Sequence, residues 1–267
     1  MKVVLYRGFA GHIHWYDPAG YLKYLHPRVD AIICIADAIR DTIRQQLFTN
    51  EDKAVTIHKG HDPAWCQDIE PADLQRAFGI PEEAFVAINV ANARPMKAIH
   101  NLVRATNYLP EDLPFHLILV GKGMDTPTMK ELVEASPHKD RIHVCGYRED
   151  PLSLVAAADT FVLSSLYGEA ITKSVIEAMA LGTTPVITDI PGNRALVSHE
   201  ENGLQVPPDD PEAIAQAIYR LQQNPEWNAC LGKKARSHIF NNFNIETTVE
   251  ETKELFMKLA GKEMNRS

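Results

Sequence analysis

The sequence predicts an α/β protein with one complete doubly wound parallel-sheet domain, preceded by part of a second domain of the same kind. Two observations predict this class. From Ala84 onward, short apolar runs alternate with amphipathic stretches, as in successive βαβ units around a parallel sheet. Ahead of Ala84 the sequence has only three apolar runs of strand length, whereas a complete doubly wound domain has about five or more.

The predicted strands and helices follow from these apolar runs. In the leading segment we expect strands at 3–6, 31–35 and 54–57, with a helix over 38–47. Gly60 and two prolines make residues 58–71 a linker. Six strands are then expected at 85–90, 116–120, 141–145, 160–163, 184–187 and 203–206, with later helices over 211–223 and 245–260.

These elements divide the chain into three parts. Residues 1–70 form a partial Rossmann-like domain with its linker, and residues 71–244 form the complete Rossmann-like domain. Residues 245–267 form a C-terminal helix whose apolar face includes Val249, Thr252, Leu255, Phe256 and Leu259. Such a stripe needs a surface to cover, so we expect this helix to pack back toward the first domain.

Bulk composition removes several functional classes. The net charge is −8, from 27 basic and 35 acidic residues spread along the chain, so we expect no nucleic-acid partner. The four cysteines lie far apart and lack the spacing of a zinc site or a redox pair, which indicates reduced thiols and a cytoplasmic protein. No apolar run approaches the roughly 20 residues of a membrane span, so any membrane contact is expected to be peripheral.

The most informative segment runs from Ser164 to Gly182, where an apolar strand ends, a loop follows and a helix begins near Thr172. The first amide groups of a helix have no partner within it, so this region can receive an anion. The residues that we expect to bind the ligand here are Gly168, Ala170, Ile171, Thr172 and Lys173. The helix dipole disfavours a cation at Lys173 by about 0.3 to 1 kcal/mol, and a bound anion would offset this cost. The alternative is a lysine that extends into water.

Two carboxylates flank this anion site. Glu169 is on the loop and Glu177 is in the helix, with seven residues between them. Carboxylates accept hydrogen bonds from paired hydroxyls, and a nucleotide sugar carries such pairs on its hexose and on its ribose. The alternative is one solvated acid and one helix-stabilising acid.

A second basic site follows the first strand of the complete domain, at Arg94 and Lys97. Both residues lie between a strand and a helix, at the carboxyl edge of the sheet, where ligands of such folds bind. An arginine fork and a compact lysine charge together suit a diphosphate leaving group. Taken alone, the pair also fits two solvated surface cations.

With these residues in place, the chain from about Ile33 to Phe256 resembles glycosyltransferase family 4, the retaining transferases of GT-B fold. Glu169 and Glu177 match the E-x7-E motif of that family, and residues 181–187 and 203–208 match its next strand and its closing strand. The resemblance implies a GT-B protein with one complete donor-binding domain and a partial acceptor-side domain at its amino terminus.

The resemblance also implies catalytic roles. Glu169 would contact the transferred sugar, while Arg94 and Lys97 would bind the diphosphate, so these three are the expected catalytic residues. The sequence has no D-x-D triplet of the kind that holds a divalent cation in many transferases. We therefore expect no metal and no cofactor, with the nucleotide-diphosphate sugar as co-substrate.

Further donor-binding residues come from the same resemblance. Glu177 would hold the ribose of the nucleotide. Gly121 belongs to a glycine-rich turn after the second strand of the domain, and Tyr147 and Arg148 belong to the segment whose backbone faces the base.

Two features depart from the family. Arg94 and Lys97 are closer in sequence than the usual pair. The strand and glycine-rich loop that begin the family's amino-terminal domain have no counterpart, so we expect an amino-terminally shortened protein. In what remains, Arg7, His12 and His14 follow a strand that ends at the cleft, where they either face the reaction centre or extend into solvent.

These inferences predict an enzyme that moves a sugar from a nucleotide-diphosphate sugar to an acceptor hydroxyl with retained configuration. The resemblance implies a saccharide or glycolipid acceptor, in polysaccharide, lipopolysaccharide or glycolipid assembly, with peripheral contact at the inner membrane face. Two alternatives stay open. One is a nucleotide-sugar epimerase, and the other is a donor-binding remnant or subunit that needs a second chain to supply the missing amino-terminal half.

Overall fold

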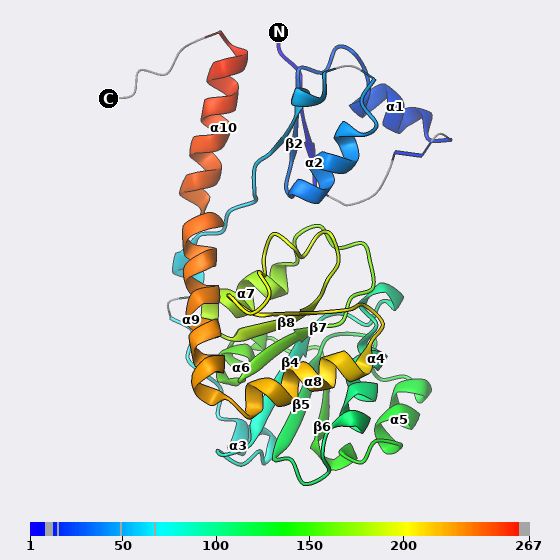
Figure 1. The fold of residues 1–267 in the computed structure, drawn as a ribbon, viewed down its shortest axis with the longest axis vertical. Helices are drawn as coiled ribbons and strands as arrows, with labels where there is room; N and C mark the ends of the chain where they lie inside the picture. The colour runs from blue at the N-terminus through cyan, green and yellow to red at the C-terminus, as the bar shows by residue number, and fades with distance from the viewer. Residues whose placement is uncertain (9–12, 15, 49, 67, 262–267) are drawn as a thin grey trace.

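The computed structural model describes residues 1–8, 13–14, 16–48, 50–66 and 68–261. It has two lobes, each built on a parallel sheet, and a long C-terminal helix rises from the second lobe beside the first (Figure 1). A three-stranded sheet precedes a six-stranded one, which confirms the predicted class of one complete and one partial α/β domain.

The first lobe holds three strands in the order β1-β2-β3. Their bounds, each within one residue of the prediction, are Val4–Arg7, Ala31–Cys34 and Ala54–Thr56. The central strand β2 is buried at all four residues, as a strand covered on both faces should be. Helix α2 (Asp37–Arg44) packs on it through Ile39 and Ile43, which share one helix face. Helix α1 (Pro18–Tyr24) is an addition to the prediction, and the Asp17 side chain caps it by accepting from the Gly20 amide.

The second lobe holds six parallel strands in the order β6-β5-β4-β7-β8-β9. All six predicted strands are confirmed, and their bounds are Phe85–Val90 (β4), Phe115–Val120 (β5), Ile142–Gly146 (β6), Thr160–Leu163 (β7), Thr184–Thr188 (β8) and Leu204–Val206 (β9). The chain moves outward from β4 to β6 and then returns to place β7 beside β4. The strand order therefore reverses between β4 and β7, and in such folds ligands bind at the carboxyl ends of these two strands.

Helices cover both faces of the six-stranded sheet. Successive residues of β4 alternate between two apolar clusters, Phe85 and Ala87 in one, Val86 and Ile88 in the other. The first cluster is completed by α4 (Ile99–Ala105), α5 (Pro127–Glu134) and α8 (Pro211–Gln222). The second is completed by α3 (Leu74–Phe78), α6 (Pro151–Ala157), α7 (Lys173–Leu181) and α9 (Pro225–Asn242). Short 3-10 turns lie at Glu51–Lys53, Pro63–Cys66, Pro95–Lys97, Thr106–Tyr108 and Lys139–Arg141.

The 18-residue helix α9 is the largest difference from the prediction. Its buried positions have helical spacing but include few large apolar side chains, and they are Asn228, Leu231, Gly232, Ala235 and Ile239. A Cβ at Gly232 would lie 2.1 Å from the carbonyl oxygen of Gly182, so the backbone of α9 approaches the end of α7 closely. A close backbone contact leaves little hydrophobic periodicity for a sequence pattern to detect.

Helix α10 (Ile245–Leu259) lies where it was predicted but contacts less of the protein than expected. Near its start, Thr248 Oγ1 donates to the His58 carbonyl oxygen and accepts from the Gly60 amide, both at 2.7 Å. None of its residues is buried, and Val249 and Phe256 are 58% and 51% exposed. The first turn of α10 therefore contacts the linker, and the packing of the apolar stripe toward the first domain stays a prediction. Residues 262–267 of this predicted part lie outside the described residues.

Candidate functional site

The candidate site lies at the carboxyl ends of β4 and β7, where the strand order reverses. Lys97 follows β4 and Glu169 follows β7, and the lysine Nζ lies 2.5 Å from Glu169 Oε1. Both side chains are largely removed from solvent, with 16% and 11% of their surfaces exposed. Two of the three predicted catalytic residues therefore meet, although 72 residues separate them in the sequence.

Ser165 fixes the same carboxylate from a second direction. Its hydroxyl donates to Glu169 Oε1 at 2.7 Å, and the residue is fully buried. Ser165 was not among the predicted site residues. The signal that pointed to it was the placement of two serines directly after an apolar strand, where a buried polar side chain needs a partner.

The two loops that carry Lys97 and Glu169 are hydrogen-bonded to each other. Ser164 Oγ donates to the carbonyl oxygen of Lys97 at 2.8 Å, and the Leu166 amide donates to that of Met96 at 2.8 Å. Gly168 has φ +79, and a Cβ there would lie 2.9 Å from Met96 Cε. The predicted Gly168 is thus favoured by its left-handed backbone conformation, whereas the flexible Met96 side chain could move away from a Cβ.

The loop after β8 packs directly on the Glu169 loop. A Cβ at Gly192 would lie 1.8 Å from the carbonyl oxygen of Glu169 and 2.6 Å from that of Ala170. Gly192 was not predicted as a site residue, since its role depends on contact between two loops that are distant in sequence. It limits how far the Glu169 loop can move toward β8.

The start of α7 presents unpaired amides beside this loop. Within the described residues, nothing accepts a hydrogen bond from the amides between Ala170 and Ser174. Thr172 is the N-cap of α7, yet its hydroxyl does not cap the helix and instead donates to Asn193 Oδ1 at 3.1 Å. These open amides and the helix dipole suit an anion, as predicted for Ala170, Ile171, Thr172 and Lys173.

Glu177 and Lys173 form an ion pair on the first turns of α7. Lys173 Nζ lies 2.7 Å from Glu177 Oε1, with side-chain exposures of 74% and 16%. In the absence of a ligand, Glu177 thus balances the cation that the helix dipole disfavours. His61 of the linker lies in the field of both charges, and burial, followed by the charges of Lys59 and Lys173, lowers its pKa.

The predicted residues after β5 and β6 lie at the same edge of the sheet. The Gly121 amide donates to the Gly146 carbonyl oxygen at 2.7 Å, and a Cβ at Gly121 would lie 1.9 Å from the Ala91 carbonyl oxygen. Lys122 Nζ lies 4.8 Å from the centre of the exposed Tyr147 ring. The turns that follow β4, β5 and β6 are thus in contact.

The predicted arginines differ in their surroundings. Arg148 forms two hydrogen bonds of 2.7 Å with Asp150 and lies 5.8 Å from the ring centre of Phe78. This pairing raises the pKa of Arg148 and lowers that of Asp150. Arg94 is exposed, and no residue in the described ranges accepts a hydrogen bond from its side chain. Arg94 is therefore available to a ligand, whereas Arg148 would first have to leave Asp150.

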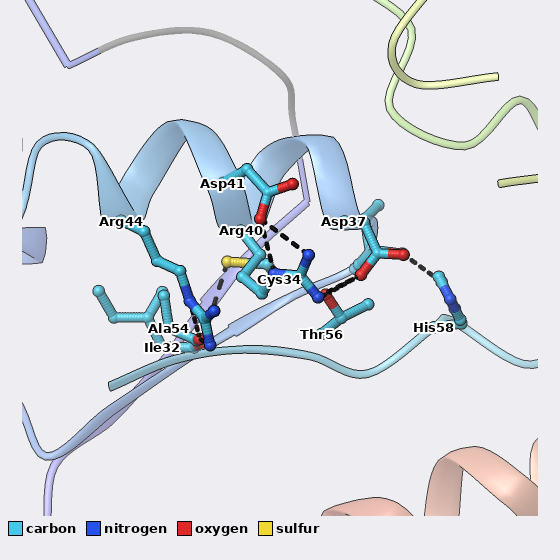
Figure 2. A network of polar contacts seen from close by, with 10 residues as sticks. Ile32, Cys34, Asp37, Arg40, Asp41, Arg44, Ala54, Thr56 and His58 are labelled. Carbon is cyan, nitrogen blue, oxygen red and sulfur yellow. Dashed lines mark hydrogen bonds and ion pairs between the residues drawn. The ribbon is translucent and has the colours of Figure 1, made fainter. Parts of the chain in front are cut away.

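The first lobe faces the site across a cleft with a polar network on α2. Arg40 donates to Asp37 at 2.6 Å and to Asp41 at 2.8 Å, and the Thr56 hydroxyl donates to Asp37 at 2.7 Å (Figure 2). His58 points toward Asp37 in the same view. A cavity of about 490 Å³ lies between this helix face and Pro191, Arg194 and Ala195 of the second lobe.

Arg7 and His14, for which the sequence leaves a position at the reaction centre or in solvent open, have different surroundings in the structure. Arg7 is 2% exposed, and its guanidinium lies 4.7 Å from the centre of the Tyr24 ring, inside the first lobe. His14 stacks on Tyr16 with ring centres 4.9 Å apart. His12 lies outside the described residues.

Comparison with known structures supports this architecture. A crystal structure of Anabaena HepE in complex with UDP matches 96% of this chain and 72% of its own, with a TM-score of 0.86 and 19% sequence identity. This likeness shows the fold, which is of the GT-B class, here with one complete and one partial Rossmann-like domain. Within the described part of the chain, every helix is too short or too polar to cross a lipid bilayer.

Sequence relatives cover most of this chain but only part of their own length. The UDP-Gal:alpha-D-GlcNAc-diphosphoundecaprenol alpha-1,3-galactosyltransferase of Escherichia coli is 26% identical over 234 residues, which are 85% of this chain and 60% of the relative. The N-acetyl-alpha-D-glucosaminyl L-malate synthase of Bacillus anthracis is 22% identical over 227 residues, 85% of this chain and 59% of the relative. The chain thus spans about 60% of the length of these relatives. The family model for glycosyl transferases group 1 matches residues 72–238, and the chain therefore belongs to this family.

Proposed function

We propose that this protein is a retaining glycosyltransferase of family 4, which transfers a sugar from a nucleotide-diphosphate sugar to an acceptor hydroxyl. The observation that carries the proposal is the buried pair of Lys97 and Glu169 at the point where the strand order reverses, beside the open amides of α7. A cation and a helix start suit the diphosphate of such a donor, which carries the leaving-group charge, and a carboxylate suits its sugar.

In this mechanism the bond between the anomeric carbon and the diphosphate oxygen breaks, the acceptor hydroxyl oxygen bonds to the same face of that carbon, and the hydroxyl proton passes to the departing diphosphate. Negative charge develops on the leaving diphosphate, so Lys97, Arg94 and the α7 amides stabilise it more in the transition state than in the ground state. Glu169 accepts hydrogen bonds from sugar hydroxyls, and Glu177 accepts them from the ribose after leaving Lys173. Protein cations and amides replace a divalent metal in this scheme.

The donor to test first is a uridine nucleotide. Structures of HepE hold UDP and UDP-glucose, and the Escherichia coli relative is named for UDP-Gal. The acceptor that we propose is a saccharide or glycolipid, since that relative acts on a sugar linked to diphosphoundecaprenol and another is named for lipopolysaccharide core biosynthesis. A glycolipid acceptor would bring the protein to the inner membrane face by peripheral contact. Cys34, Cys145 and Cys230 carry free thiols, which suits the reducing cytoplasm.

Binding should be measured before transfer, because the chain spans about 60% of its relatives. Titration calorimetry with UDP in excess chelator should give a defined dissociation constant. Lys97→Met should weaken it about tenfold or more, since a charge-assisted hydrogen bond contributes about 1.5 to 3 kcal/mol. Lys130→Met is the matched control, because Lys130 is an exposed lysine paired with Asp125. Binding that appears only with magnesium or manganese would contradict the proposed chemistry.

Transfer and its stereochemistry need a second assay. Release of UDP from a UDP-sugar, followed by chromatography, would detect turnover, and NMR of the glycoside would give its anomeric configuration. We expect the configuration of the donor to be retained. A product of inverted configuration would overturn the assignment to the retaining family, and release of an epimerised nucleotide sugar without free UDP would indicate an epimerase.

A further inference from the structure

Thr172 occupies a capping position but does not cap its helix. A threonine at the N-cap normally accepts a hydrogen bond from the second or third amide of the helix. In α7 the Thr172 hydroxyl donates instead to Asn193 Oδ1 at 3.1 Å. The Thr172 carbonyl oxygen accepts a hydrogen bond from the Val175 amide at 3.1 Å. The Lys173 and Ser174 amides have no acceptor among the described residues.

Asn193 is held firmly enough to keep the hydroxyl in this direction. It is fully buried, its amide donates to the Ile190 carbonyl oxygen at 2.9 Å, and its own carbonyl oxygen accepts from Leu196 at 3.0 Å. The side-chain amide points to the Thr188 carbonyl oxygen at 3.5 Å. If Thr172 turned toward its helix, Asn193 Oδ1 would lose its only hydrogen bond among the described residues, and an orphaned buried acceptor is costly.

Hydrogen bonds through Thr188 and Ser165 link Asn193 to the loop that carries Glu169. Thr188 Oγ1 donates to the Ser165 carbonyl oxygen at 2.5 Å, and Ser165 Oγ donates to Glu169 at 2.7 Å. Next to Asn193, Gly192 lies against the carbonyl oxygen of Glu169. Asn193 thus belongs to a buried set of contacts that joins the ends of β7 and β8 to the start of α7.

We propose that Asn193 is a positioning residue of the donor site, which draws the Thr172 hydroxyl away from α7 so that the first-turn amides stay open to a phosphate of the donor. This inference rests on the proposed function. An amide that the protein caps with its own hydroxyl cannot also donate fully to a ligand, so self-capping and phosphate binding compete. By holding the Thr172 hydroxyl, Asn193 prevents self-capping and leaves the amides open to the ligand. The start of α7 therefore has no side-chain cap.

The proposal is tested by removing the two partners separately and together. Asn193→Ala releases Thr172 to cap α7, and the affinity for UDP should fall about tenfold. Thr172→Val keeps the side-chain shape but removes the hydroxyl, so the amides stay open and the affinity should stay within about threefold of the unaltered protein. In the double variant no hydroxyl can cap the helix, and the affinity should return to that of Thr172→Val. A double variant as weak as Asn193→Ala would overturn the proposal, because the loss would then come from loop damage.

Hydrogen exchange separates this inference from the proposed function. In the protein without nucleotide, the Ser174 amide should exchange rapidly and should become protected in Asn193→Ala, whatever nucleotide the protein binds. Adding UDP to the unaltered protein should shift and protect the Lys173 and Ser174 amides. Unchanged exchange at Ser174 in Asn193→Ala would refute the role of Asn193. If Asn193→Ala does not fold, UDP that binds the unaltered protein without affecting these amides overturns the proposal. Absence of any nucleotide binding alongside the expected exchange change would instead count against the proposed function alone.

Discussion

Lys97 Nζ lies 2.5 Å from Glu169 Oε1, so each residue neutralises the other before any donor arrives. This arrangement predicts coupled stabilities. Lys97→Met or Glu169→Gln alone leaves an uncompensated, largely buried partner and should lower the free energy of unfolding by about 2 to 4 kcal/mol. The double variant should lose less than the sum of the two. Urea unfolding of all four proteins gives the coupling energy.

The control for this cycle is the exposed pair of Lys130 and Asp125, whose side chains are 70% and 82% exposed. Solvent screens such a pair, so its coupling should be below about 1 kcal/mol. Equal coupling energies for the two pairs would show that the burial of Lys97 and Glu169 has no energetic consequence.

Glu177 and Glu169 should divide the recognition of the donor. Glu177→Ala should weaken UDP itself by about tenfold, because we assign it to the ribose, whereas Glu169→Ala should spare UDP and lose the added affinity of a UDP-sugar. Calorimetry with UDP and with a UDP-sugar distinguishes the two roles. Glu134→Ala, at an exposed acid paired with Lys139, is the control. Equal losses of UDP affinity in the Glu177 and Glu169 variants would reject the division.

Gly192→Ala should disrupt the site without changing any polar side chain. The added Cβ would lie 1.8 Å from the Glu169 carbonyl oxygen, which forces one of the two loops to move. We expect a loss of about 2 kcal/mol or more in unfolding free energy and a marked loss of UDP-sugar affinity. Gly79→Ala is the control, since at φ +70 it meets no neighbour within 4 Å and should cost only about 1 kcal/mol of backbone strain. A Gly192→Ala protein as stable as Gly79→Ala would contradict the packing described here.

The paired histidines of β5 and β6 should make the protein sensitive to mild acid. His116 Nδ1 and His143 Nε2 lie 3.0 Å apart in stacked rings. Burial, with smaller contributions from His143 and Arg141, lowers the pKa of His116 to about 4, and burial also lowers the pKa of His143. A histidine in the unfolded chain has a pKa of about 6.5. Between about pH 6.5 and 4, the two histidines therefore bind more protons in the unfolded chain than in the folded protein. Their stabilising effect is thus complete above about pH 6.5 and is lost as the pH falls.

Thermal unfolding between pH 7.5 and 4.5 measures this effect. The Tm should fall by several degrees over the acid half of that range, and His116→Gln should flatten the profile, because a neutral side chain replaces one titrating group. A His116→Gln profile parallel to that of the unaltered protein would assign the acid sensitivity to other groups.

Much of the fold follows from the sequence by itself. Nine strands were predicted and found, because each is an apolar run bounded by turn residues and buried on a parallel sheet. The spacing of Glu169 and Glu177 on a loop and a helix start was equally readable, since it depends only on local chain geometry. The position of Arg94 and Lys97 at the carboxyl edge of the sheet follows from their place after a strand.

Only the tertiary structure decided which side chains meet. The pairing of Lys97 with Glu169 depends on the return of the chain that places β7 beside β4, and the roles of Ser165, Gly192 and Asn193 depend on contacts between the loops after β7 and β8. Helix α9 was not predicted because its buried face includes Asn228, Gly232 and Ala235, whose small or polar side chains weaken the apolar pattern, and Gly232 makes a close backbone contact. The strands and the start of α7 can be predicted from local sequence patterns, because these elements depend mainly on residues that are close together in the chain. The direction of the Thr172 hydroxyl is set by Asn193, 21 residues further along the chain, and no local propensity encodes that contact.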